Sequence, residues 1–133
     1  MLILAVAFLS FTTVFAQKPE VVTNNKPGWH KIGETTVDFK TDKDQILVLG
    51  ADKFKKIQLK VKDAPIHMED LQVFYENDTK EDVTVRSDFR AGSESRVIDL
   101  KGADRRLKKV EFVYRTVPNT KKDKAQVELW GLK

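Results

Sequence analysis

Cysteine is absent from the sequence of 133 residues, and this removes several classes of protein chemistry at once. A chain without thiols has no disulfide framework, no thiolate nucleophile and no cysteine-ligated metal. Histidine occurs only twice, and no glycine-rich segment of the kind that holds phosphate groups is present. We therefore expect a fold held together by side-chain packing alone, with no cofactor.

Neither sign of charge dominates the chain. Lys and Arg number 24 and Asp and Glu number 20, which gives a net charge of +4, and the two signs are interspersed. A nucleic-acid-binding protein normally shows one basic stripe with aromatic residues in it. The lysine-rich stretch at 121–124, KKDK, is short and contains an aspartate. The pattern favours a soluble protein and argues against nucleic acid as a partner.

Charged side chains are also missing from the first 16 residues, MLILAVAFLSFTTVFA. This run is shorter than the roughly 20 residues that span a membrane, and it ends in small residues before the chain turns polar. We expect a signal peptide at 1–16, a flexible lead-in at 17–28 and one secreted or periplasmic domain at 29–133, with no membrane span after cleavage. An uncleaved anchor is the alternative, because no Lys or Arg precedes the apolar run.

The rest of the chain alternates apolar and polar residues in short segments. In 54–62, Ile57, Leu59 and Val61 share one side of the predicted strand, and lysines occupy much of the other. Strands are predicted at 35–39, 45–49, 54–62, 71–76, 82–86, 95–100, 109–115 and 125–130. Turn-forming residues separate them. This spacing predicts an all-β fold, an antiparallel, jelly-roll-like β-sandwich of about eight strands, with a β-barrel as the alternative.

Two segments depart from the simple alternation. The run QILVL at 45–49 is continuously apolar apart from its first residue, which predicts burial on both faces of the strand. Glu69 and Asp70 interrupt the alternation between Met68 and Leu71. This interruption predicts a β-bulge.

A charged cluster lies between the strands predicted at 95–100 and 109–115. Alternation places Asp99 on the face opposite Ile98, where a carboxylate needs a partner, and an arginine provides a bidentate one. We expect a structural charge clamp of Asp99 with Arg106; Arg86 and Arg96 are the other partners considered. The functional alternative is an anionic ligand held by five converging arginines. These are Arg86, Arg90, Arg96, Arg105 and Arg106. Four acidic residues within the same stretch favour the structural interpretation: Asp88, Glu94, Asp99 and Asp104.

The segments 37–48, 54–78 and 95–114 together resemble a family of small exported bacterial proteins of unknown function. The best-known member of that family is a short periplasmic enterobacterial protein. The shared pattern is Arg-x-Ile-Asp-Leu-x-Gly-x-x-Arg, formed here by Arg96, Ile98, Asp99, Leu100, Gly102 and Arg105. The resemblance implies a secreted β-sandwich, and it provides no catalytic residues.

Candidates for catalysis and metal binding are few. His30 and His67 do not stand at a recognisable spacing from a serine nucleophile, so we expect satisfied or exposed histidines and no enzyme. Asp38, Asp42 and Asp44 surround one turn and form a weak calcium candidate. The glycine and late glutamate of calcium loops are missing there, so turn chemistry is the favoured interpretation.

The two tryptophans, Trp29 and Trp130, lie at the two ends of the predicted domain. On an exposed face they would stack on a sugar ring; at a sheet end they would seal the core, which is the favoured interpretation. Trp130 has the parity opposite to Val127 and Leu129, which favours an outward position. We expect a non-enzymatic binding or interaction module for an envelope glycan or protein. The alternative is a hydrolase accessory or weak enzyme with its site near the loops from Arg86 to Arg106. The candidate ligand-binding residues are Trp29, Trp130, Arg86, Arg96, Arg105 and Arg106.

Overall fold

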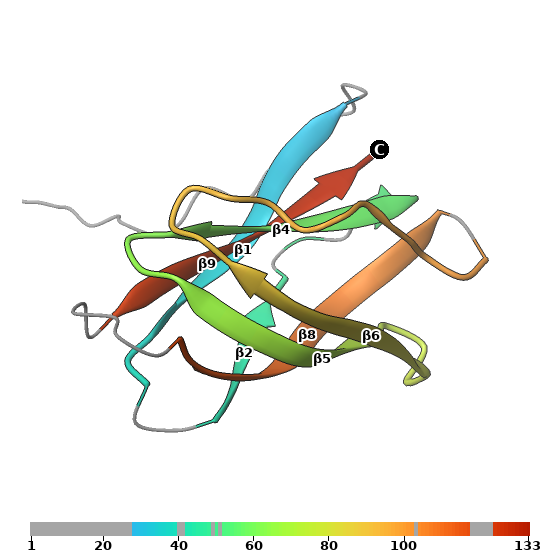
Figure 1. Ribbon diagram of the computed structural model, residues 1–133. Coiled ribbons are helices and arrows are strands. Elements are labelled where there is room, and N and C mark those ends of the chain that lie inside the picture. Colours follow the sequence, from blue (N-terminus) through green and yellow to red (C-terminus); the bar gives the residue numbers. More distant parts are fainter. Residues whose placement is uncertain (1–27, 40–41, 49, 51, 103, 118–123) are drawn as a thin grey trace, which may run out of the picture.

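The structure is a computed structural model in whose described residues nine antiparallel β-strands form two sheets (Figure 1). It describes residues 28–39, 42–48, 50, 52–102, 104–117 and 124–133. The predicted signal peptide and nearly all of the lead-in lie outside the described residues. The predicted β-sandwich is confirmed, and the β-barrel alternative is wrong because the strands divide between two sheets.

The first sheet has the strand order β1-β9-β4-β7, and the second has the order β2-β8-β5-β6, with β3 paired to β8. The strands of the first sheet are β1 (Trp29–Val37), β9 (Ala125–Leu132), β4 (Lys56–Lys62) and β7 (Ile98–Asp99). Those of the second are β2 (Lys43–Leu47), β8 (Arg105–Thr116), β5 (Ile66–Tyr75), β6 (Lys80–Phe89) and β3 (Lys53–Phe54). The last strand, β9, lies between β1 and β4, so the two ends of the described chain meet in one sheet (Figure 1).

The core forms where the inward faces of the two sheets meet. In β4, Ile57, Leu59 and Val61 are buried, while the residues between them lie on the outward face. Each fully buried side chain of this size contributes about 1.5–3 kcal/mol of transfer free energy. The alternation in the sequence places apolar side chains on one face of each strand, and the burial of these side chains drives the two sheets together.

The predicted β-bulge is confirmed. Pairing of β5 shifts register between Met68 and Asp70 on both of its sides, toward β6 and toward β8. On β6, Arg86 adopts a positive φ of 42° close to this position. A bulge of this kind increases the local twist of the strand and redirects its side chains.

The prediction of two-sided burial at 45–49 is wrong. Ile46 is fully buried, but Leu47 is 56% exposed. The reason is that the two sheets cover only each other's inward faces, so in the described part of the chain no layer lies over the outward face of β2.

Several strand boundaries also differ from the prediction; β5 and β8, for example, begin at Ile66 and Arg105 instead of 71 and 109. The strand predicted at 95–100 contracts to the two residues of β7. The start of β1 at Trp29 was not predicted, since a register shift between Lys31 and Gly33 breaks the alternation there. No helix long and apolar enough to cross a membrane occurs in the described part of the chain.

Candidate functional site

The two tryptophans share the outward face of the first sheet. In the β1–β9 pairing, Trp29 lies opposite Leu132 and Lys31 lies opposite Trp130. Opposed residues of antiparallel strands point to the same face, so Trp29 and Trp130 are diagonal neighbours there. Trp29 is 37% exposed, and Trp130 is partly exposed. The expectation that they seal the core is therefore wrong, and the outward parity of Trp130 is confirmed.

We call the outward side of the β1–β9–β4–β7 sheet the tryptophan face. Besides the two tryptophans and Leu132, it carries mainly charged side chains and amides. These are Lys31, Glu34, Lys56, Gln58, Lys60, Lys62, Glu94, Asp99, Gln126 and Glu128. Charged and amide side chains therefore flank the two tryptophans on this outward face.

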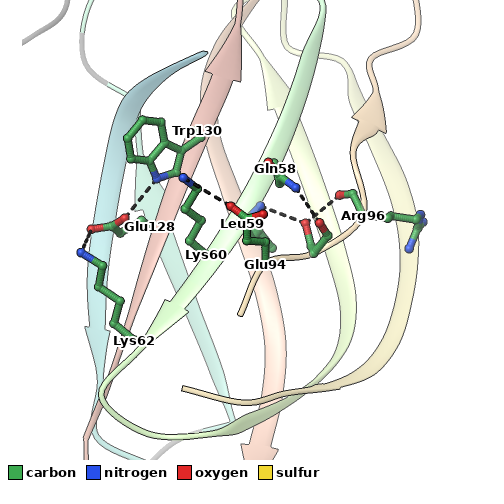
Figure 2. Close-up of polar contacts among 9 residues, drawn as sticks. Gln58, Leu59, Lys60, Lys62, Glu94, Arg96, Glu128 and Trp130 are labelled. Atoms are coloured by element: carbon green, nitrogen blue, oxygen red, sulfur yellow. Dashed lines mark hydrogen bonds and ion pairs between the residues drawn. The ribbon is translucent and has the colours of Figure 1, made fainter. Parts of the chain in front are cut away.

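Glu128 is the centre of the polar contacts on this face, and it is only 3% exposed. Its carboxylate accepts a hydrogen bond from Nε1–H of Trp130 at 3.0 Å (Figure 2). The Nζ atoms of Lys62 and Lys31 lie 3.0 Å and 3.2 Å from its other oxygen, Oε2. The three donors fix the carboxylate and, with it, the orientation of the indole ring.

The charge state of Glu128 follows from these contacts. Burial is the largest single effect and raises the pKa of its carboxyl group. The hydrogen bonds from Trp130, Lys62 and Lys31 together outweigh burial, and the pKa lies below its ordinary value. Glu128 is therefore a carboxylate at neutral pH. In turn, Glu34 and Glu128 raise the pKa of Lys31, with Glu34 as the largest cause.

Lys60 links the indole ring to the edge of the sheet. Its ammonium lies 4.0 Å from the centroid of the Trp130 ring and 3.4 Å from Oε2 of Glu94 (Figure 2). A cation–π contact at an exposed site contributes only about 0.5–1 kcal/mol. The ammonium is therefore held weakly over the ring and can exchange that contact for one with a ligand.

A groove of about 520 Å³ lies beside Lys60 and is lined by residues 60–62 of β4 and by the segment 92–95. The segment is fixed to β4 by backbone hydrogen bonds, such as that from Gly92 N to the carbonyl oxygen of Val61 at 2.7 Å. Oγ of the buried Ser95 accepts a hydrogen bond from Leu59 N at 2.9 Å and donates one to the Arg96 carbonyl at 2.7 Å. The groove thus has a rigid wall on the side away from Trp130.

A second groove, of about 410 Å³, lies over the outward face of the second sheet. Its polar side chains contact one another: Gln72 donates to Asp82 at 2.9 Å, and Lys43 lies 3.2 Å from Glu111. The aromatic residue that lines it, Phe112, belongs to the core. Among the described residues, this groove offers no exposed aromatic ring to a ligand.

The candidate arginines do not converge on one point. The Arg105 guanidinium stacks on the Tyr75 ring at 3.8 Å and donates to Thr79 Oγ1 at 3.2 Å. Arg96 donates to the Thr84 carbonyl at 2.8 Å. Thr79 and Thr84 stand five residues apart, which is about 16 Å along an extended chain. Arg86, Arg90 and Arg106 are exposed, and none of the five arginines lines either groove described above.

The predicted clamp of Asp99 with Arg106 is wrong. Asp99 lies opposite Lys56 in the β4–β7 pairing, and its carboxylate accepts a hydrogen bond from Lys56 Nζ at 2.7 Å. The Asp99 side chain is 77% exposed. Arg106 instead lies opposite Lys53, where β3 pairs with β8. An outward lysine of the adjacent strand β4, rather than an arginine of β8 in the other sheet, is the partner of Asp99.

The calcium candidates Asp38, Asp42 and Asp44 are not gathered into a site. Among the described residues, no group of three or more His, Asp or Glu side chains has an arrangement that would hold a metal ion. Asp44 Oδ1 accepts a hydrogen bond from the next backbone N–H, and the Asp42 carbonyl accepts one from Tyr114 N. These contacts are those of a turn and a strand end.

Sequence reasoning missed a second charged cluster, at the β-bulge. His67 Nε2 lies 2.9 Å from Glu69 Oε1, and its Nδ1 contacts the Asp88 carboxylate. Arg115 lies 3.6 Å from the same Glu69 oxygen. The bulge at Glu69 and the β5–β6 register bring these residues together. The bulge was visible in the sequence, but the register that adds Asp88 and Arg115 was not.

Comparisons with known proteins identify the family. The model of the family described as Domain of unknown function (DUF2541) matches residues 2–131, so the chain belongs to this family. The resemblance to a family of unknown function is thereby confirmed. No curated protein matches the chain.

Two solved structures match the chain, one of them with a TM-score above 0.5. One is the structure of Pseudomonas aeruginosa AlgX, with a TM-score of 0.51 and 13% identity, over 78% of this chain and 27% of that chain. The chain thus spans about a quarter of that protein's length, and the likeness supports the fold alone. The structure of infectious bursal disease virus Gx strain has a TM-score of 0.32 and 9% identity, over 91% of this chain and 36% of that chain. A TM-score this low does not indicate a shared fold.

Proposed function

We propose that this member of the DUF2541 family is a secreted or periplasmic binding module without catalytic activity, and that it binds an envelope glycan on the tryptophan face. The observation that carries the proposal is the position of Trp29 and Trp130 as diagonal neighbours on one outward sheet face. Large aromatic side chains in this position are unusual, because a tryptophan gains more by burial in the core.

The chemistry of the face suits a sugar. A sugar ring presents C–H groups on its flat faces and hydroxyl groups around its rim. The indole of Trp130 offers a flat apolar surface to the C–H groups once the weakly held Lys60 ammonium moves off the ring, and the ring itself is fixed by the hydrogen bond to Glu128. The Lys60–Glu94 pair at the adjoining groove offers a donor and an acceptor for the hydroxyl groups.

The charged groups of the face support binding rather than catalysis. Glu128 is the buried carboxylate, and its two oxygens are already engaged by three donors. A general acid or base needs a proton-exchanging group free to reach the substrate. Glu34 and Asp99 are each paired with a lysine as well. We therefore assign these carboxylates a structural role.

Intrinsic fluorescence with a panel of soluble oligosaccharides tests the proposal. Both tryptophans of the chain lie on the proposed face, so binding there should change the emission. We expect Trp130→Ala to weaken binding by about tenfold, the equivalent of ~1.4 kcal/mol, because the stacking surface is lost. Trp29→Ala should have a smaller effect, because Trp29 is the more exposed of the two and lies farther from the groove beside Lys60, next to β4.

The matched control is Leu47→Ala, which removes an exposed apolar side chain from the second sheet. It should leave both the affinity and the emission unchanged. If the folded protein binds no glycan of the panel, the proposal is wrong. Binding that is equally strong in Trp130→Ala would also contradict it, because the ligand would then bind elsewhere.

A further inference from the structure

Resting on the proposed glycan-binding function, we infer that the tryptophan face selects an uncharged glycan, although it is rich in lysine. The net charge of +4 and the row of lysines along β4 suggest a polyanion as the ligand. The ion pairs on the face lead to the opposite conclusion.

Every lysine of the tryptophan face is paired with a carboxylate of the same face. Lys56 pairs with Asp99 at 2.7 Å, and Lys60 pairs with Glu94 at 3.4 Å. Lys62 and Lys31 share Glu128, and Lys31 also contacts Glu34. Four ammonium groups therefore meet four carboxylates, and the positive charge that gives the chain its excess lies elsewhere.

This pairing works against an anionic polymer. Binding of a polyanion gains free energy when ammonium groups neutralise it and release its counterions. Here each ammonium group would first have to leave a carboxylate, and that carboxylate would then face the polymer with like charge. Like-charge contacts across an interface oppose binding and exclude the wrong partner. The face thus has the charge pattern that disfavours a uronate or sulfated glycan.

The same ion pairs can form hydrogen bonds with the hydroxyl groups of a neutral sugar. A hydroxyl both donates and accepts hydrogen bonds, so it can bridge an ammonium group and a carboxylate that lie side by side. Lys60 Nζ lies over the Trp130 ring, 4.0 Å from its centroid, and 3.4 Å from Glu94 Oε2 (Figure 2). A sugar that stacks on the ring displaces the ammonium from the ring face, and its rim hydroxyl groups then meet the Lys60–Glu94 pair. A bridging hydroxyl leaves the charge balance of the pair intact, whereas a sugar carboxylate does not.

Titration of the full chain with neutral and anionic oligosaccharides of matched length tests this inference. Cello-, xylo- and laminari-oligosaccharides are the neutral probes, and oligogalacturonate and heparin fragments are the anionic ones. We expect binding to a neutral probe, with an affinity that changes less than about twofold between about 50 mM and 200 mM salt. At the higher salt concentration, the anionic probes should bind at least about tenfold more weakly than the neutral probe does.

The variant Glu94→Gln separates charge from packing. It frees Lys60 from its carboxylate, so binding of the neutral probe should weaken, and binding of the anionic probe should strengthen and become dependent on salt. Glu111→Gln is the control, since it removes a lysine-paired carboxylate from the second sheet, and it should change neither. Far-ultraviolet circular dichroism confirms that both variants fold.

The possible failures are distinguishable. Preferential binding of an anionic probe that weakens steeply with salt and depends on Trp130 would overturn the inference and leave the proposed function standing. Unchanged affinities in Glu94→Gln would overturn the role of the Lys60–Glu94 pair. The absence of any glycan binding by the folded wild-type chain would overturn the inference and the proposed function together.

Discussion

Replacement of Glu128 by glutamine tests the polar centre of the tryptophan face. Glutamine keeps an oxygen that accepts the Trp130 N–H, but it loses the charge that faces Lys31 and Lys62. The side chains of those lysines are 38% and 54% exposed, so they regain much of their hydration when the carboxylate is lost. Each contact is therefore worth at most about 1 kcal/mol, and we expect Glu128→Gln to lower the free energy of unfolding by about 1–2 kcal/mol.

Alanine at the same position should cost more. Glu128→Ala also removes the acceptor of the Trp130 N–H, and a hydrogen bond to a charged acceptor contributes about 1.5–3 kcal/mol. The total loss of unfolding free energy should reach about 2.5–5 kcal/mol. Urea unfolding at neutral pH, followed by circular dichroism, measures both variants. The control is Glu94→Gln, an exposed carboxylate with one lysine at 3.4 Å, which should cost less than about 0.5 kcal/mol.

The contribution of the Glu128 charge to stability should depend on pH. The pKa of Glu128 is lowered in the folded state, so its charge stabilises the fold above the ordinary value of 4.5. That stabilisation is lost as pH falls through the lowered pKa. The difference in the free energy of unfolding between wild type and Glu128→Gln should therefore be largest at neutral pH and decrease in acid. Equal stability of Glu128→Gln and Glu94→Gln at neutral pH would refute this reasoning.

Three further predictions concern the fold and are tested by thermal or urea unfolding. Gly131→Ala should lower the free energy of unfolding by about 1–3 kcal/mol, because a Cβ there would lie 2.6 Å from the Phe54 ring. Unchanged stability would show that the Phe54 ring moves aside at no cost. Arg105→Ala should destabilise more than Arg106→Ala, since only Arg105 stacks on a buried ring and bridges two turns; equal losses would contradict this. Asp99→Ala should lower the free energy of unfolding by less than about 1 kcal/mol, because its ion pair with Lys56 is exposed. A larger loss would contradict this and indicate a buried partner of Asp99.

Local patterns in the sequence were enough to predict the architecture. Alternation in the segment of β4 identified its buried and outward faces, and the same parity placed Trp130 outward. The interruption at Glu69 located the β-bulge. These features depend on the two-residue period of a strand, which a single sequence contains.

The partners of the charged residues could not be predicted in the same way, because they depend on which strands become neighbours. Asp99 pairs with Lys56 only because β7 joins the edge of β4. Glu128 becomes buried only because β9 lies between β1 and β4, where side chains from both neighbouring strands reach it. The two-sided burial predicted for 45–49 failed because an apolar run does not show how many layers the fold stacks, and the first sheet covers only the inward face of β2.

The most direct test of a glycan site on the tryptophan face is a nuclear magnetic resonance titration of the indole N–H groups. The chain has two tryptophans, so two indole resonances are expected, and Trp29→Phe assigns them. On addition of a neutral oligosaccharide, we expect the Trp130 resonance to shift in a saturable manner, together with the amides of β4 and of segment 92–95. Saturable shifts confined to the second sheet, with both indole resonances unmoved, would contradict the proposed site.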